Sequence, residues 1–149
     1  MNAPELYLEN QLCFPLYAAS RLTTKIYGPY LEELGITYPQ YLVLLILWQH
    51  NDQSVKKIGQ QLYLESNTLT PLLKRLEQKQ LIERNRSTTD ERTVMISLTK
   101  AGKVLKKKAK QVPEKIIASF GDDTISEKEI VTFQKTLFKL LEVLNAKTS

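Results

Sequence analysis

The spacing of the apolar residues changes its period at residue 81, and this change constrains the fold more than any other feature. Two short helical patterns, at residues 55–63 and 67–80, are separated by the turn "LES". The stretches "LIERNRS" (81–87) and "RTVMISLT" (92–99) then alternate apolar with polar residues around the polar tip "TTDE", as is typical of a β-hairpin. Two helices joined by a tight turn and followed by a hairpin predict a winged helix-turn-helix.

Helical patterns flank this segment on both sides. Apolar residues between 12 and 34 recur on one helical stripe, and we expect a bend at Gly28-Pro29 because proline removes a backbone donor. Thr37 followed by Gln40 is a capping-box pattern, which predicts a helix from about Tyr38 to Gln49. The run "YLVLLILW" within it is apolar on nearly every side and should be buried.

Polar residues that can cap further helices stand at four positions: Ser54, Ser66, Thr99 and Ser126. The helix after Thr99 is rich in lysine and is expected to run to Phe120 with a bend near Pro113. The helix after Ser126, where Glu129 completes a second capping box, carries an amphipathic apolar stripe. The predicted fold class is therefore mainly α with a small β-hairpin wing.

The composition limits the classes of protein to which the chain can belong. Its 149 residues, 42% hydrophobic and 25% charged, fit one globular domain that can bury a core. The sole cysteine and the sole histidine, Cys13 and His50, fall short of an internal disulfide or a structural zinc site, so we expect no metal and no cofactor. The longest apolar run is too short to cross a membrane, which favours a cytoplasmic protein. The formal charge of +5 favours an anionic partner.

The second short helical pattern has the side chains of a DNA-reading helix. Short hydrogen-bonding groups lie near its N-terminus, where base edges or phosphates would sit, and a basic pair follows one to two turns later. The candidate residues on this helix are Ser66, Asn67, Thr68, Thr70, Pro71, Lys74 and Arg75, and those on the hairpin are Arg84, Arg86, Asp90 and Arg92. The alternative is that these charges form an ordinary solvated face.

The hairpin tip places a carboxylate two residues before an arginine, in the sequence "DER". At that spacing Asp90 can hold the guanidinium of Arg92 in a fixed orientation, and a pre-organised arginine suits the narrow, electronegative minor groove of DNA. The alternative is a surface ion pair that contributes little.

From about Leu12 to Leu144 the chain resembles the MarR family of dimeric winged-helix repressors, in particular its one-cysteine, peroxide-sensing OhrR-type branch. The most specific parts are "LTPLLKR" and the wing "DER". The resemblance implies that residues 1–36 and 100–149 form a helical dimerisation region and residues 37–99 the DNA-binding region. It also implies that the helix after Ser66 enters the major groove and that Arg92 enters the minor groove. A homodimer of this kind reads double-stranded DNA at a pseudo-palindromic, inverted-repeat operator with half-sites about 34 Å apart.

The residues around the sole cysteine support two opposite interpretations, a reactive thiolate and a buried structural thiol. If Asn10 caps the first helix, Cys13 falls in its first turn, where backbone N–H groups and the helix dipole favour a thiolate. Leu12, Phe14 and Leu16 surround the sulfur with apolar groups, and desolvation disfavours the charged form. Taken alone, these residues favour a buried, structural cysteine.

The family resemblance implies the opposite role for Cys13, a reactive cysteine that accepts hydrogen bonds from tyrosines, some of them in the other subunit. Tyr17, Tyr27 and Tyr38 stand at the matching positions; each on its own is better explained by packing at an interface, and it is the three together beside the sole cysteine that favour a sensor. Pro15 departs from the family pattern after "CF". Peroxide would convert the thiolate to a sulfenic acid, followed by a mixed disulfide with a small thiol, a sulfenamide or overoxidation. The altered interface would change the spacing of the two DNA-reading heads and release the operator.

Three other functions are compatible with parts of the sequence. A MarR-type repressor could instead respond to a small apolar or phenolic ligand in the interface pocket, with Cys13 structural. A thiol peroxidase would use Cys13 catalytically, but the chain has no second cysteine and no motif of another enzyme class, so we expect no enzyme. A non-specific DNA binder would use the lysines of "KVLKKKAK", which more often form a solvated helix face.

Overall fold

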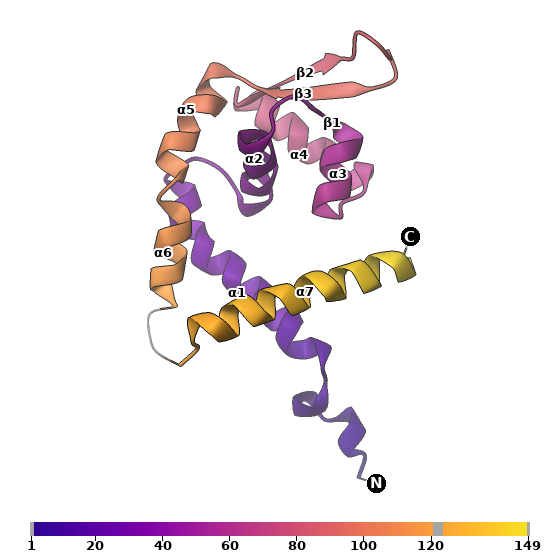
Figure 1. The fold of residues 1–149 in the computed structure, drawn as a ribbon, viewed down its shortest axis with the longest axis vertical. Helices are drawn as coiled ribbons and strands as arrows, with labels where there is room; N and C mark the ends of the chain where they lie inside the picture. The colour runs from indigo at the N-terminus through magenta and orange to yellow at the C-terminus, as the bar shows by residue number, and fades with distance from the viewer. Residues whose placement is uncertain (1, 121–123, 149) are drawn as a thin grey trace. The chain divides into compact units, whose positions relative to one another are not determined.

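The computed structural model describes residues 2–120 and 124–148, and Figure 1 shows the chain as a ribbon. The elements follow in this order: η1 (Pro4–Leu6), η2 (Leu8–Asn10), α1 (Cys13–Glu32), α2 (Tyr38–Gln49), β1 (Gln53–Ser54), α3 (Val55–Leu62), α4 (Ser66–Gln78), β2 (Ile82–Arg86), β3 (Val94–Leu98), α5 (Lys100–Ala109), α6 (Val112–Ser119) and α7 (Glu127–Thr148). The chain divides into two compact units, Met1–Ile116 and Ile117–Ser149. The predicted fold class, mainly helical with a small wing, is confirmed.

The predicted hairpin is formed by β2 and β3, which pair antiparallel from Ile82 opposite Leu98 to Arg86 opposite Val94. A third strand, β1, pairs with the other edge of β3, so the sheet order is β1-β3-β2. β1 was not predicted from the sequence, because a strand of two residues is too short to show an alternating pattern. This strand ties the start of the helix-turn-helix to the wing.

The core of the first unit lies between α2, the helix-turn-helix and the inner face of the sheet. Its fully buried side chains include Val43, Leu44, Leu47, Ile58, Leu69, Leu73, Leu76, Ile82 and Ile96. The leucines of α4 recur at helical spacing, so one face of α4 is buried and its other face is free. The run "YLVLLILW" is largely buried as predicted, except that Leu45 points outward.

Most of the predicted helix caps form. Thr37 and Gln40 make a complete capping box, and Ser54 and Thr99 each accept a hydrogen bond from a backbone N–H three residues ahead, at 3.1 Å. In the second unit, Ser126 Oγ accepts from the backbone of Glu129, whose carboxylate accepts in return from the backbone N–H of Ser126.

Two predicted caps are wrong. Ser66 is the first residue of α4, and the capping position belongs to Glu65, whose backbone carbonyl accepts from the amides of Thr68 and Leu69. The reason is that α3 ends one residue earlier than predicted, because Tyr63 adopts a left-handed conformation with φ 57°. Asn10 does not cap α1 either.

The region predicted as one helix from Thr99 to Phe120 is two helices. α5 ends at Ala109 and α6 begins at Val112, so the bend predicted near Pro113 is a break between two helices. Pro113 lies in the first turn of α6, where its missing N–H is no loss. By contrast, α1 runs without interruption across Gly28-Pro29. Within the described ranges, every helix is too short or too polar to span a bilayer.

Candidate redox site and nucleic-acid interface

Cys13 is the first residue of α1 and is exposed in the single chain. The single chain alone therefore does not bury Cys13. Asn10 was predicted to set the helix start, but it lies in η2, where its side-chain amide donates to the carbonyl of Pro4 at 2.7 Å. The first turn of α1, which the structure describes completely, contains no carboxylate. Cys13 thus lies at the positive end of the helix dipole, in a first turn with no opposing charge.

Tyr17 follows Cys13 by one helical turn and is 65% exposed. The guanidinium of Arg21, one turn further, lies 5.0 Å from the centre of the Tyr17 ring. Cys13, Tyr17 and Arg21 therefore form one stripe on α1. Arg21 was not among the predicted site residues, although its i+4 spacing from Tyr17 was a signal for it.

Tyr27 and Tyr38, the other two predicted tyrosines, lie together with ring centres 4.8 Å apart. Tyr41 joins them, 5.9 Å from Tyr27 and 6.3 Å from Tyr38. Burial raises the pKa of all three phenols, and for Tyr27 and Tyr41 the neighbouring tyrosines raise the pKa further. At neutral pH these groups are therefore O–H donors. The sequence analysis missed Tyr41.

The structure does not bring Cys13 and the tyrosine cluster (Tyr27, Tyr38 and Tyr41) together within one chain. Cys13 and Tyr27 lie on the same helix, α1, at its first and fifteenth positions. At 1.5 Å of rise per residue, they are separated by about 21 Å along the axis. A site that contains both can therefore form only with a second chain.

The predicted DNA-reading residues on α4 lie on its free face. Ser66, Asn67, Thr68, Pro71, Lys74 and Arg75 are exposed, and Thr70 is half-buried. The leucines at positions 69, 72, 73 and 76 face the core and fix the orientation of the helix. Short polar groups at the N-terminal end and cations further along are thus presented on one surface, as a helix in the major groove requires.

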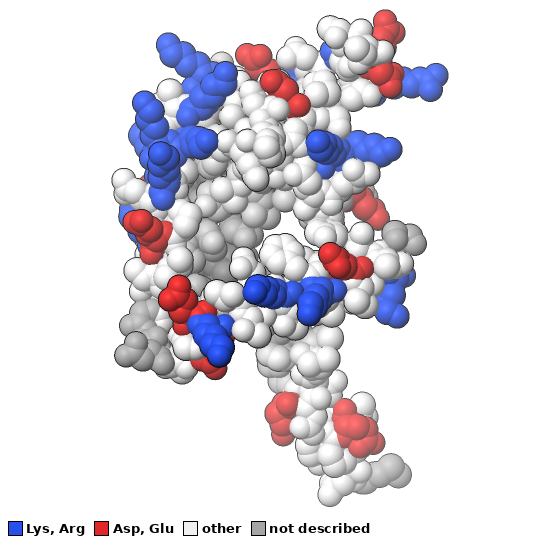
Figure 2. All heavy atoms as spheres, in the orientation of Figure 1, with Lys and Arg blue, Asp and Glu red and all other residues white. Residues whose placement is uncertain are grey.

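The wing carries the remaining candidates. Arg86 is exposed, and its Nη1 donates to the carbonyl of Glu91 at 2.8 Å, across the hairpin tip. Arg84 is half-buried and pairs with Glu77 of α4 at 3.5 Å, so it braces the wing against the helix. Figure 2 shows further Lys and Arg side chains gathered along the edge of the molecule where α5 lies.

The prediction that Asp90 holds the guanidinium of Arg92 is wrong. Among the described residues these two side chains form no ion pair; instead Asp90 Oδ1 accepts from the backbone N–H of Arg92 at 3.0 Å. Asp90 Oδ2 accepts from the hydroxyl of Thr93 at 3.3 Å. Aspartate commonly bonds the backbone two residues ahead in turns, and here that local bond prevails. The side chain of Arg92 is left exposed.

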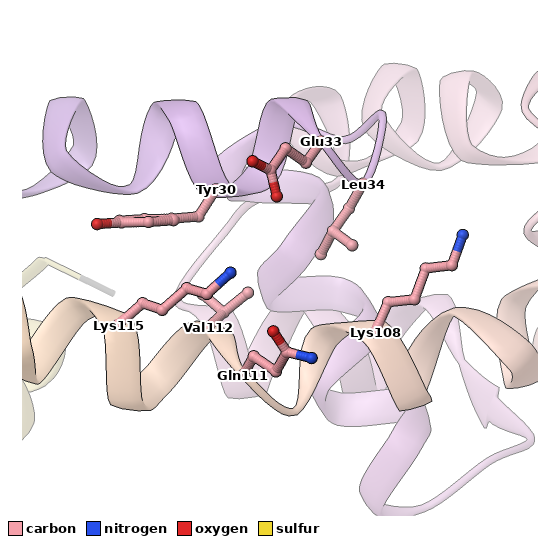
Figure 3. A pocket seen from close by; sticks show the side chains of 7 residues that line it. All are labelled: Tyr30, Glu33, Leu34, Lys108, Gln111, Val112 and Lys115. Carbon is pink, nitrogen blue, oxygen red and sulfur yellow. The ribbon is translucent and has the colours of Figure 1, made fainter.

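A small pocket of about 190 Å³ opens between the end of α1 and the junction of α5 with α6. Figure 3 shows its lining residues: Tyr30, Glu33, Leu34, Lys108, Gln111, Val112 and Lys115. The ammonium of Lys115 lies 5.7 Å from the centre of the Tyr30 ring. Residues 2–120 and 124–148 contain no cluster of His, Cys, Asp and Glu side chains that could hold a metal ion.

The comparisons with known proteins agree with this geometry. Residues 25–109 match the family described as transcriptional regulator SarA/Rot. The chain is 54% identical over 140 residues to the organic hydroperoxide resistance transcriptional regulator of Bacillus subtilis, covering 94% of this chain and 93% of that protein. The solved structure of reduced AbfR bound to DNA is 41% identical, with a TM-score of 0.76 over 97% of this chain and 99% of that one. AbfR, from Staphylococcus epidermidis, is also solved with a disulfide formed. A MarR variant from E. coli in complex with operator DNA, at 23% identity, has the same fold with a TM-score of 0.80 over 91% of this chain and 98% of that one.

The fold and these matches define a DNA-binding transcriptional regulator of the winged-helix class. Within that class the chain belongs to the SarA/Rot family of transcriptional regulators, and over nearly its whole length it is similar to a regulator of organic hydroperoxide resistance. It is therefore a regulator rather than an enzyme.

Proposed function

We propose that this protein is a homodimeric, cytoplasmic repressor that releases an inverted-repeat operator when an organic hydroperoxide oxidises Cys13. The observation that carries the proposal is the exposed Cys13 at the N-terminus of α1, in a chain so similar to a regulator of organic hydroperoxide resistance. In this proposal the free face of α4 reads the major groove and Arg92 at the wing tip reads the minor groove.

A homodimer would bring together Cys13 and the tyrosine cluster, which lie apart within one chain. Apolar side chains of α7, including Phe133, Phe138 and Leu144, are exposed, as is Leu12 beside the cysteine. An exposed apolar surface of this extent favours association. In the dimer, Cys13 and Tyr17 of one subunit face Tyr27 and Tyr38 of the other, whose phenolic O–H groups stabilise the thiolate and orient the peroxide.

The redox step follows from thiolate chemistry. The Cys13 thiolate attacks the terminal peroxide oxygen, the O–O bond breaks, and the alkoxide leaves and takes a proton to become an alcohol. The sulfur, now a sulfenic acid, is oxidised while the peroxide is reduced. A small thiol then condenses with it to a mixed disulfide and releases water, since the chain has no second cysteine. The disulfide form of AbfR supports a disulfide as the end state.

Release of DNA requires that the oxidised site favour a different arrangement of the winged helix-turn-helix regions of the two subunits. Moving the protein from mostly bound to mostly released takes about 5 kcal/mol of differential stability between the two states. Loss of the tyrosine hydrogen bonds to the sulfur in both subunits, together with the bulk of the added group, supplies a difference of this kind.

The test is operator affinity by fluorescence anisotropy, with an inverted repeat from the gene's own promoter at fixed salt. Wild type and Cys13→Ser are measured before and after stoichiometric cumene hydroperoxide. We expect peroxide to release the wild type and to leave Cys13→Ser bound. Equal behaviour of the two proteins would contradict the role of Cys13.

The pocket beside Tyr30 and Lys115 favours a second candidate, a repressor released by a small aromatic anion. The two candidate functions predict different behaviour of the Cys13→Ser variant. A ligand of that class would release Cys13→Ser as well as wild type, and Lys115→Met would weaken the response in both.

A further inference from the structure

Trp48, the sole tryptophan of the chain, is held by α5 at two points. Its indole Nε1 donates to the backbone carbonyl of Gly102 at 2.9 Å. The ammonium of Lys106, one turn further along α5, donates to the backbone carbonyl of Trp48, also at 2.9 Å. The end of α2 is thus fixed to α5 by bonds that join residues far apart in sequence.

The same indole ring touches the tyrosine cluster. Tyr41, which is only 3% exposed, meets Trp48 edge to face, with ring centres 6.3 Å apart and an interplanar angle of 67°. Tyr41 in turn contacts both Tyr27 and Tyr38. Tyr27 and Tyr38 are therefore in contact with a buried ring that packs on Trp48.

Gly102, whose carbonyl accepts the indole hydrogen bond, packs directly against the base of the wing, Leu81 and Leu98. A Cβ at this position would lie 2.2 Å from the carbonyl oxygen of Leu81, the residue before β2, and 3.1 Å from Leu98 at the end of β3. The hydroxyl and the amide of Thr99 also donate to the carbonyls of Gln80 and Leu81, at 2.6 and 3.1 Å. The first turn of α5 is therefore packed closely against, and hydrogen-bonded to, the residues that flank β2 and β3.

We propose that Trp48 is the positioning residue that couples the tyrosine cluster to the wing, through its hydrogen bond to Gly102. This inference rests on the proposed function, because oxidation of Cys13 is the event that would disturb Tyr27 and Tyr38. The route itself is a continuous chain of contacts from Tyr27 through Tyr41, Trp48 and Gly102 to Leu81. A route of contacts becomes a coupling only when a measured interaction energy supports it.

The experiment is a double-mutant cycle on operator affinity in the reduced protein, which needs no peroxide. Tyr27→Ala disturbs the cluster, and Trp48→Phe keeps an aromatic ring but removes the N–H donor. In the wild-type background we expect Tyr27→Ala to weaken operator binding by about tenfold, and in the Trp48→Phe background by less than about threefold. Lys106→Met, which removes the other bond between α5 and Trp48 but keeps the indole bond to Gly102, is the matched control and should preserve the full effect of Tyr27→Ala.

Equal fold-losses in both backgrounds would overturn the proposal, and so would a Tyr27→Ala variant that binds as tightly as wild type. To distinguish coupling through the indole N–H from a packing role of the ring, the sole tryptophan is replaced with benzothienylalanine. This residue keeps the ring shape but has sulfur in place of N–H. This isostere should reproduce the loss of coupling seen with Trp48→Phe while leaving the melting temperature and reduced-state affinity near those of wild type. Cumene hydroperoxide added to the same proteins separates the two proposals. If the cycle shows coupling but peroxide does not release the wild type from DNA, the proposed function of Cys13 is wrong, whereas the coupling through Trp48 is supported.

Discussion

Asp90 Oδ1 lies 3.0 Å from the backbone nitrogen of Arg92, and this bond orders the wing tip without restraining the guanidinium. Together with the bond from Thr93, it closes the turn that presents Arg92 to solvent. The carboxylate therefore acts on the backbone of the loop, and its charge is secondary.

This relationship predicts different effects for two substitutions of Asp90. Asp90→Asn keeps an oxygen that can accept the Arg92 N–H and should bind the operator within about threefold of wild type, whereas Asp90→Ala should lose about 1 kcal/mol of binding free energy, or roughly fivefold in Kd. Anisotropy titrations at one salt concentration measure both. If Asp90→Asn is as weak as Asp90→Ala, the negative charge is what matters and an ion pair with Arg92 in the complex must replace the present account.

Two helical glycines should respond in opposite directions to alanine. A methyl group at Gly102 would meet the carbonyl oxygen of Leu81 at 2.2 Å, a backbone atom that can move only with the wing. At Gly28 no atom lies within 4 Å, and alanine is the better helix former. In urea unfolding, Gly102→Ala should lower the free energy of unfolding by about 1 to 3 kcal/mol, through overpacking. Gly28→Ala should raise it or leave it unchanged, and a loss there would show that Gly28 is covered in the dimer.

The tyrosine cluster predicts a loss of stability at alkaline pH. Burial raises the pKa of Tyr27, Tyr38 and Tyr41 above the usual 10.0. A group whose pKa is higher in the folded state than in the unfolded state stabilises the fold fully below the unfolded pKa, and this contribution is lost as pH rises through the folded pKa. The free energy of unfolding should therefore fall as pH rises above 10.0. Tyr41→Phe, measured by the same unfolding experiment, should show a shallower fall; an identical slope would remove Tyr41 from the explanation.

Local signals in the sequence were sufficient for much of the fold. The capping box at Thr37, the caps at Ser54 and Thr99 and the alternation of the hairpin each depend on residues within a few positions of one another. The predicted cap at Asn10 was wrong because the Asn10 side chain bonds the Pro4 carbonyl instead, and the one at Ser66 because Glu65 occupies the capping position of α4.

The site could be predicted only in part, for a related reason. Single residues such as Cys13, Tyr27 and Tyr38 were identified through the family resemblance, but contacts across long stretches of sequence leave no local pattern. Trp48 and Gly102 are far apart in the chain and meet only in the folded protein, so neither drew attention. The role of Asp90 was mistaken because its spacing from Arg92 suits the backbone amide as well as the guanidinium.

The most direct test of the central claim, a sensing site shared between two chains, mixes two inactive proteins. Cys13→Ser lacks the sulfur, and a Tyr27→Phe, Tyr38→Phe double variant lacks the phenols. In a heterodimer, a shared site would pair the intact cysteine of one chain with the intact tyrosines of the other. The measurement is the rate of Cys13 oxidation by cumene hydroperoxide, followed by intact mass, in each homodimer and in the tagged, purified heterodimer. We expect the heterodimer to regain the wild-type rate at its one cysteine and the tyrosine-variant homodimer to stay slow. A heterodimer as slow as that homodimer would contradict it.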